Sequence, residues 1–140
     1  MLIKDVMRKA VTISPEATRK EIYELACKHP DNGLFIVADK SGLFLGDIHE
    51  NDLFFMLLPD DLYEDIGVEL AFDIEKKFFA KTAGELMHKH DVSCHPDDDI
   101  LTVGLSFIRE GVTAMPVLNN WGVVQGYVTQ GMLLRHLDSP

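Results

Sequence analysis

The chain alternates amphipathic stretches with short apolar runs. From Glu16 to Lys28, and again from Asp97 to Glu110, apolar side chains recur every three to four positions, which predicts a helix in each segment. After each helix comes an apolar run, Leu34 to Ala38 or Met115 to Leu118. A polar turn with one glycine follows, then a second apolar run that ends at a glycine and leads to a third strand segment. Two apolar runs joined by a short turn that contains glycine predict a hairpin.

The whole pattern occurs twice. In each copy a short extended segment ends at a proline, Pro15 or Pro96, because proline disfavours helix in the residue before it. Each copy closes with a predicted helix, from Asp52 to Leu58 and from Met132 to Leu137. The offset between copies is about 80 residues, which is the signature of an internal repeat. The matching segments are Asp5-Val6-Met7 with Glu85-Leu86-Met87, Val11 to Pro15 with Val92 to Pro96, Leu34 to Gly42 with Ala114 to Gly122, and Gly46-Asp47-Ile48 with Gly126-Tyr127-Val128.

Each repeat therefore reads strand, helix, strand, strand, helix. A unit of about 50 residues buries too little surface to be stable by itself, so we expect two copies packed by their sheets. The predicted boundaries are 1–58 for the first repeat and 81–140 for the second. The connecting segment, 59–80, is predicted to form one or two short helices packed against the pair or a second subunit. Its apolar side chains are Tyr63, Ile66, Val68, Leu70, Phe72, Ile74, Phe78 and Phe79.

Composition indicates which partners and which cellular compartment suit this fold. With 46% hydrophobic and 26% charged residues the chain is typical of a folded protein. A net charge of -10 disfavours nucleic acid as a partner, although local N–H groups can still hold a mononucleotide. The longest apolar run, Leu53 to Leu58, is far shorter than the ~20 residues of a membrane span. The N-terminus lacks the pattern of a secretory signal, and Cys27 and Cys94 are expected to be free thiols, so we expect a cytoplasmic protein.

The sequence shows no motif for catalysis. It contains neither a nucleophile elbow nor a phosphate-binding glycine-rich loop, and we predict that the chain is not an enzyme. The segment from His88 to His95, with the acids from Asp97 to Asp99, offers chemically adequate metal ligands. Its spacing matches no standard zinc pattern, and a helix end followed by a strand would scatter the side chains, so no metal site is predicted. The apolar run from Phe54 to Leu58 is expected to lie in the core or in a subunit interface. Trp121, at a predicted hairpin turn, is expected to contact a partner or a second subunit.

The doubled pattern resembles a tandem pair of cystathionine-β-synthase (CBS) domains. The resemblance rests on Met7 and Met87, on the proline after each first strand, on Met115-Pro116-Val117 and on the Gly-x-Ile/Val closing strands. It covers nearly all of the chain outside Pro59 to Ala80. It implies an α/β (α+β) fold of two βαββα repeats packed with pseudo-two-fold symmetry, and a homodimer. It also implies that a cleft between the repeats takes AMP, ADP, ATP or S-adenosylmethionine as a ligand, with no cofactor required.

The resemblance also implies site residues. In the family the adenine lies against the first two strands, and a Ser/Thr-x-x-Asp pattern at the last helix places a hydroxyl on phosphate and the Asp on the ribose. A carboxylate can accept two hydrogen bonds from a cis-diol, and a hydroxyl beside helix N–H groups suits phosphate. Carried over to this chain, the candidate residues are Thr12, Ile13, Phe35, Ile36, Val37, His49, Asp52, Pro116, Val117 and Thr129.

Both repeats depart from that pattern. The first has His49 where the hydroxyl belongs but keeps Asp52, and the second keeps Thr129 but has Met132 where the acid belongs. We expect the first site to hold a ribose on Asp52, with Thr12 and Ile13 at the base and His49 donating to phosphate when protonated. In a purely structural alternative, Asp52 and Thr129 only cap their helices.

Two functions follow from these patterns. The first is a regulatory module that binds a small molecule, an adenosine derivative, and signals to an effector protein. The second is a dimerising or protein-interaction module that has lost ligand binding, which the split signature favours. A metal-dependent enzyme built on the histidine-rich segment is a third class, and no metal is expected.

Overall fold

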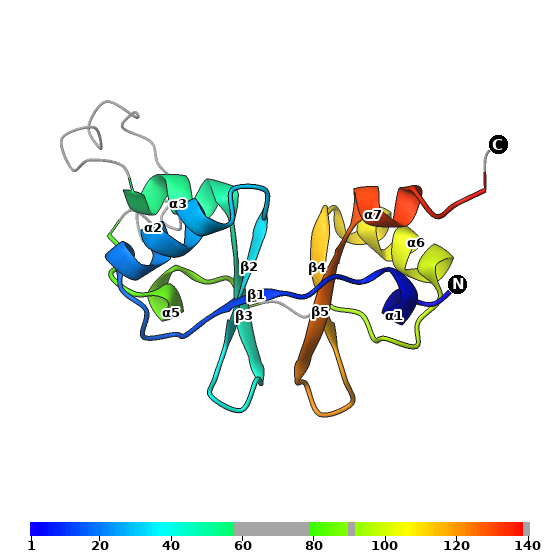
Figure 1. Cartoon of the computed structure of the whole chain (residues 1–140), viewed down its shortest axis with the longest axis horizontal. Coiled ribbons are helices and arrows are strands. Elements are labelled where there is room, and N and C mark those ends of the chain that lie inside the picture. Colours follow the sequence, from blue (N-terminus) through cyan, green and yellow to red (C-terminus); the bar gives the residue numbers. More distant parts are fainter. Residues whose placement is uncertain (58–78, 90–91, 139–140) are drawn as a thin grey trace.

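The computed structural model of the chain describes residues 1–57, 79–89 and 92–138. It has two halves, each built from a small sheet and its helices (Figure 1), as the repeat predicts. The elements in chain order are α1 (Ile3–Val6), β1 (Val11–Ile13), α2 (Arg19–Lys28), β2 (Leu34–Ala38), β3 (Phe44–His49), α3 (Glu50–Leu57), α5 (Ala83–Leu86), α6 (Ile100–Glu110), β4 (Ala114–Leu118), β5 (Val124–Thr129) and α7 (Gln130–Leu134).

The two sheets follow one plan. In the first, β1 runs parallel to β2, and β2 pairs antiparallel with β3. In the second, β4 and β5 form the equivalent hairpin, with an irregularity after Val117 that matches the one after Val37. In the described part of the first extended segment of the second repeat, from residue 92 on, the pairing is a single parallel bridge, Cys94 to Val117. The sequence suggested two strand segments around Gly46 and around Gly126, but β3 and β5 each run through their glycine as one strand.

Because Gly46 and Gly126 have no side chain, another backbone segment can pair closely with the edge strand of each sheet. A Cβ on Gly46 would lie 2.5 Å from the carbonyl oxygen of His88, and one on Gly126 would lie 2.6 Å from that of Arg8, so a larger residue would collide with the neighbouring backbone. The backbone of His88 exchanges two hydrogen bonds with Asp47, of 3.0 and 2.8 Å. Arg8 makes the same pair with Tyr127, at 3.1 and 2.9 Å.

Side-chain caps set where two helices begin. The pattern predicts helix from Glu16, but α2 starts at Arg19, because the Thr18 hydroxyl accepts a hydrogen bond from the Glu21 N–H. In the second repeat the Asp99 carboxylate caps α6 by accepting from the Leu101 N–H at 2.9 Å. Capping residues fix the start of a helix because their side chains accept hydrogen bonds from first-turn N–H groups that have no partner within the helix.

The short helices α1 and α5 are exchanged between the halves. Ile3 and Val6 of α1 are buried in the core of the second repeat, and Ala83 and Leu86 of α5 are buried in the core of the first. Figure 1 shows α1 beside α6, and α5 on the side of α2 and α3. Each repeat thus completes its core with a helix from the other part of the chain.

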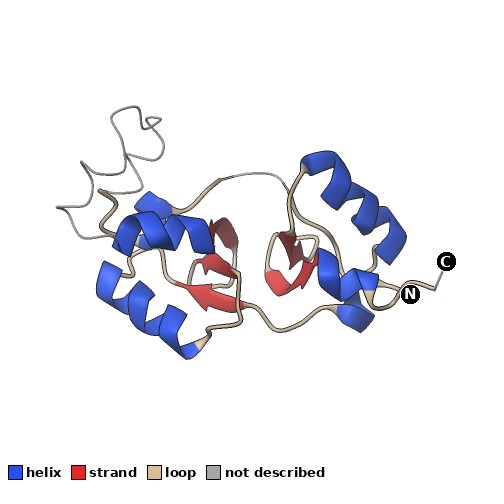
Figure 2. Ribbon diagram, turned by 90° about the horizontal axis from the view of Figure 1, so that it is seen from above, coloured by secondary structure: helices blue, strands red, loops and turns tan. Residues whose placement is uncertain are grey.

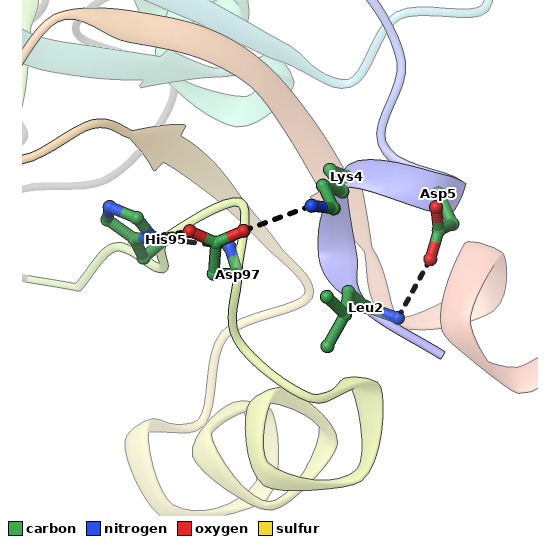
Figure 3. A network of polar contacts seen from close by, with 5 residues as sticks. All are labelled: Leu2, Lys4, Asp5, His95 and Asp97. Atoms are coloured by element: carbon green, nitrogen blue, oxygen red, sulfur yellow. Dashed lines mark hydrogen bonds and ion pairs between the residues drawn. The ribbon is translucent and has the colours of Figure 1, made fainter.

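Polar contacts hold the exchanged helices in place. The Ile3 N–H donates to the Asp98 carbonyl at 2.9 Å, and the Ala83 N–H donates to the Ala17 carbonyl at 3.0 Å. The Lys4 ammonium lies 3.3 Å from the Asp97 carboxylate. Figure 3 shows this ion pair between α1 and the loop before α6. This exposed ion pair adds little stability, so the buried apolar side chains of α1 supply most of its docking energy.

The sheets of the two halves face each other at the centre, with helices outside (Figure 2). Leu34 and Ile36 of β2 pack with Ala114 of β4 in a small core between the repeats. Backbone hydrogen bonds of 2.9 Å also join the hairpin turns, from the Phe44 N–H to the Gly122 carbonyl and from the Val124 N–H to the Gly42 carbonyl. The predicted helices of the connecting segment fall mostly outside the described residues. Within the described ranges, no helix has the length and apolar character needed to span a membrane.

Candidate ligand cleft between the repeats

A cleft of about 520 Å³ opens where α3 and α7 begin. A volume of this size suits a small molecule. The lining residues pair up by the repeat, so that the cleft is centred on the pseudo-two-fold relation: Gly33 with Thr113, Leu34 with Ala114, His49 with Thr129, Glu50 with Gln130, and Asn51 with Gly131.

The cleft combines an apolar base with polar rims. Leu34 and Ala114, both buried, come from the starts of β2 and β4. The Thr129 hydroxyl caps α7 by accepting from the Met132 N–H at 3.1 Å, which leaves its own O–H able to donate to a ligand. His49 faces Thr129 from the other repeat. The arrangement can hold a flat apolar ring and a polar or anionic group side by side.

Asp52, the predicted ribose acceptor, does not line this cleft. Its side chain is only 5% exposed. One carboxylate oxygen, Oδ2, accepts from the backbone N–H of His49 at 2.9 Å, and the other, Oδ1, lies 3.1 Å from Nε2 of His88. Asp52 therefore caps α3, as the structural alternative expects, and also binds a histidine from the far side of the connecting segment.

The structure divides the other candidate residues. Thr12 and Ile13 line a different hollow of about 740 Å³, built almost wholly from the first repeat. Hydrogen bonds from Ser14 and Ser41 lower the pKa of Glu16 and Asp39 in its wall, so both stay ionised. The remaining candidates are core residues of β2 and β4, buried in their strands: Phe35, Ile36, Val37, Pro116 and Val117. Of the ten candidates, only His49 and Thr129 line the cleft between the repeats.

Sequence reasoning named His49 and Asp52 but missed that Asp47 and His88 join them at the edge of β3. We call these four side chains the acid–histidine cluster. Asp47 is fully buried, and its Oδ1 lies 3.6 Å from Nε2 of His49. The rings of His49 and His88 meet edge to face, with centroids 6.4 Å apart. The signal in the sequence is Asp47, an acid inside a buried strand at the position where the second repeat has Tyr127.

The histidine-rich segment does not converge on one site. His88 pairs with β3 of the first repeat, whereas Nδ1 of His95 lies 3.8 Å from Asp97, beside α1 (Figure 3). Across residues 1–57, 79–89 and 92–138, no group of three or more His, Cys, Asp or Glu side chains is arranged to hold a metal ion.

Two βαββα repeats around a shared cleft define a CBS domain pair, a class of regulatory modules. The sequence pattern of the CBS domain matches residues 3–58 and 83–139, and the chain belongs to this family. A relative, the uncharacterised protein MJ1426 of Methanocaldococcus jannaschii, is 24% identical over 98% of this chain and 91% of its own length.

Solved structures show the same fold. The CBS domain pair of protein MJ0100, in complex with 5′-methylthioadenosine and S-adenosyl-L-methionine, superposes with a TM-score of 0.74 at 20% identity, covering 96% of this chain and 94% of that one. CBSX2 in complex with AMP also gives 0.74, at 18% identity, covering 96% and 93%. At these identities the likeness establishes the fold.

Proposed function

We propose that this chain is a non-catalytic regulatory module that binds an adenosine derivative in the cleft between its repeats and signals to an effector protein. The observation that carries the proposal is the pairwise equivalence of the cleft's lining residues. A ligand there touches both repeats at once, so that its binding can favour one relative arrangement of the repeats. The adenosine ligands of MJ0100 and CBSX2 support the choice of ligand class. We further propose a cytoplasmic location, since both cysteines are free thiols.

The cleft's chemistry supports the same ligand class. Leu34 and Ala114 offer apolar surface to a purine, while Thr129 and Gln130 offer donors to its polar substituents. His49 can donate to a phosphate when its imidazole is protonated.

Thermal unfolding in the presence of AMP, ADP, ATP, S-adenosylmethionine and 5′-methylthioadenosine tests this function. A ligand at 100 times its dissociation constant adds about 2.7 kcal/mol to the free energy of unfolding, which raises the melting temperature by several degrees. No shift with any of the five at millimolar concentration would contradict the adenosine proposal.

Gly131 provides a matched pair of variants for locating the ligand. It lies in the first turn of α7, and a Cβ there meets nothing closer than the Thr129 hydroxyl at 4.0 Å. Gly131→Glu places a carboxylate in the cleft, where it repels phosphate but suits the start of a helix. We expect Gly131→Glu to abolish the shift with AMP, ADP and ATP, and Gly131→Ala to retain it. Equal shifts in both variants would place the ligand elsewhere.

A second candidate function is supported by an apolar groove of about 700 Å³ between α6 and α7. Leu105, Ile108 and Leu134 in this groove are each more than half exposed. Exposed apolar patches of this kind mark interfaces, and we propose that a second copy of the chain covers the groove in a homodimer. Sedimentation equilibrium is expected to show a dimer that Leu105→Glu dissociates and Thr102→Glu, on the same helix but outside the groove, does not. A monomeric wild-type chain would exclude this proposal.

A further inference from the structure

Each repeat has a groove between its two outer helices, one between α2 and α3 and the other between α6 and α7. Thr18 and Asp99, the N-caps of α2 and α6, are equivalent by the repeat, so the two helices can be compared position by position. The two grooves are lined by equivalent positions: Tyr23 with Gly104, Cys27 with Ile108, Leu53 with Leu133 and Phe54 with Leu134.

The helix α6 presents an apolar stripe to solvent. Leu101, Leu105 and Ile108 recur at helical spacing on one face, and they are 60%, 58% and 71% exposed. Leu134 of α7, 68% exposed, continues the stripe across the groove. Gly104 lies within the stripe, and a Cβ there would meet nothing within 4 Å, so a side chain of a partner has room to enter. Burial of such a face against another protein surface is favourable.

The equivalent face of α2 is charged. Lys20 and Glu24 stand at the positions where α6 has Leu101 and Leu105, and both are exposed. Burial of a charged side chain against an apolar surface is strongly unfavourable unless the charge is paired. The face of α2 is therefore a poor partner for the stripe on α6 of a second copy, whereas that stripe is complementary to itself.

We propose that the homodimer forms by an isologous contact between the second repeats alone: α6 and α7 of one copy pack on α6 and α7 of the other, and α2 and α3 stay outside the interface. The inference rests on the proposed homodimer and adds which half of the chain makes it. An isologous contact uses the same patch on both copies, which must be self-complementary. A net charge of -10 per chain opposes association, so an uncharged stripe is the favoured place of contact.

This arrangement leaves the first repeats projecting from the dimer. Figure 1 shows α2 and α3 in one half of the molecule and α6 and α7 in the other. Cys27 is exposed on α2, and we expect it to remain exposed in the dimer. Ile108, at the equivalent position of α6, is expected to be covered.

These two equivalent positions allow one chemical group to be attached to either face. Burial raises the pKa of the Cys94 thiol to about 12, so a maleimide dye reacts at Cys27 in the wild-type chain. In the double variant Cys27→Ser/Ile108→Cys the same dye reacts at position 108. Sedimentation equilibrium then gives the dissociation constant of the dimer with and without dye. We expect the dye on Cys27 to change this constant by less than about threefold, and the dye on the double variant to raise it by about tenfold or more.

Charge substitutions test the same contact without a dye. Leu101→Lys and Leu105→Glu give α6 the charges that α2 carries at the equivalent positions, and each is expected to raise the dissociation constant by about tenfold or more. The charge reversals Lys20→Glu and Glu24→Lys are the matched controls on α2, and they are expected to change it by less than about threefold. All four positions are exposed, so each variant is expected to keep the circular dichroism of the wild-type chain.

The outcomes separate this inference from the homodimer on which it rests. If the dye on Cys27 or the reversals on α2 weaken the dimer by about tenfold, the first repeat lies in the interface, and the inference is overturned while the homodimer stands. If the substitutions on α6 leave a wild-type dimer intact, the second copy does not cover the groove between α6 and α7, and both proposals are overturned. A monomeric wild-type chain likewise overturns both.

Discussion

Cys94 is a buried core residue of the second repeat that lies in a polar stretch of the sequence. Its neighbours His95 and Asp97 are polar, yet Cys94 is buried among apolar side chains with Sγ 3.8 Å from the Pro116 carbonyl. Burial, together with the nearby Asp98 carboxylate, raises the pKa of the Cys94 thiol to about 12. Only the thiolate is a good nucleophile, so this thiol is inert near neutral pH, whereas Cys27 is exposed on α2.

We therefore predict that iodoacetamide at pH 8 modifies Cys27 and spares Cys94. Mass spectrometry after tryptic digestion gives the ratio of labelled peptides, and we expect Cys94 to react fully only once urea unfolds the chain. Raising the pH toward 12 favours its thiolate and should increase its reaction. Equal labelling of both thiols in the native protein at pH 8 would show that the second core opens readily.

The candidate residues show what sequence can predict at this scale. The cap roles of Asp52 and Thr129 follow from their positions before or within a first turn, and the structure has both caps. The contact from His88 to Asp52 joins residues 36 positions apart. No local pattern encodes such a pair, because it depends on where the segment after α5 crosses the edge of β3.

At the scale of elements, α1 is the least self-sufficient part of the structure. Four residues are too few for a helix that is stable in isolation, so α1 exists because Ile3 and Val6 fit the core of the second repeat. Its stability is a property of that core and not of its own sequence.

We predict that Ile3→Ala lowers the free energy of unfolding by about 2–4 kcal/mol, because a fully buried isoleucine leaves a cavity when it is truncated. Lys4→Ala, which removes the exposed pair with Asp97, is expected to cost less than about 1 kcal/mol. Urea denaturation followed by circular dichroism measures both. Similar small losses in the two variants would mean that α1 is not docked in solution.

The exchange of α1 and α5 was not predictable from the sequence, although the repeat itself was. The opening segments that end at Met7 and Met87 are alike, so either fits either core by pattern alone. The hairpins, by contrast, follow from local signals such as Gly42 and Gly122, which take positive φ angles of 86° and 79° at their turns that few other residues adopt.

On the scale of the whole molecule, the exchange makes the two repeats one folding unit. Residues 1–57 lack the Ala83 and Leu86 of their own core, and residues 79–140 lack Ile3 and Val6. We predict that each of these two fragments alone gives the circular dichroism of a largely unfolded chain, and that mixing them restores helical signal. Independent folding of either fragment would contradict this account. The intact chain should accordingly unfold in one transition.

Packing of the two repeats by their sheets was predictable because one repeat buries too little surface alone, whereas the pseudo-two-fold symmetry of that packing was expected from the family resemblance. The cleft was placed between the repeats on the strength of the family resemblance, and its lining could not be listed from sequence. Phe35 and Val37 were expected near the adenine of a ligand. They point to the opposite face of β2 from Ile36 and belong to the core of their own repeat.

The reciprocal docking of α1 and α5 also bears on how such a chain can arise. A gene for one repeat would encode a protein whose core is complete only when two copies exchange their first helices, that is, a domain-swapped homodimer. Joining two such genes makes the exchange intramolecular, and each repeat then meets the other at an effective concentration on the order of millimolar. Once association no longer requires two identical chains, the halves are free to diverge, and His88 with Asp52 on one side and Arg8 with Met132 on the other record that divergence.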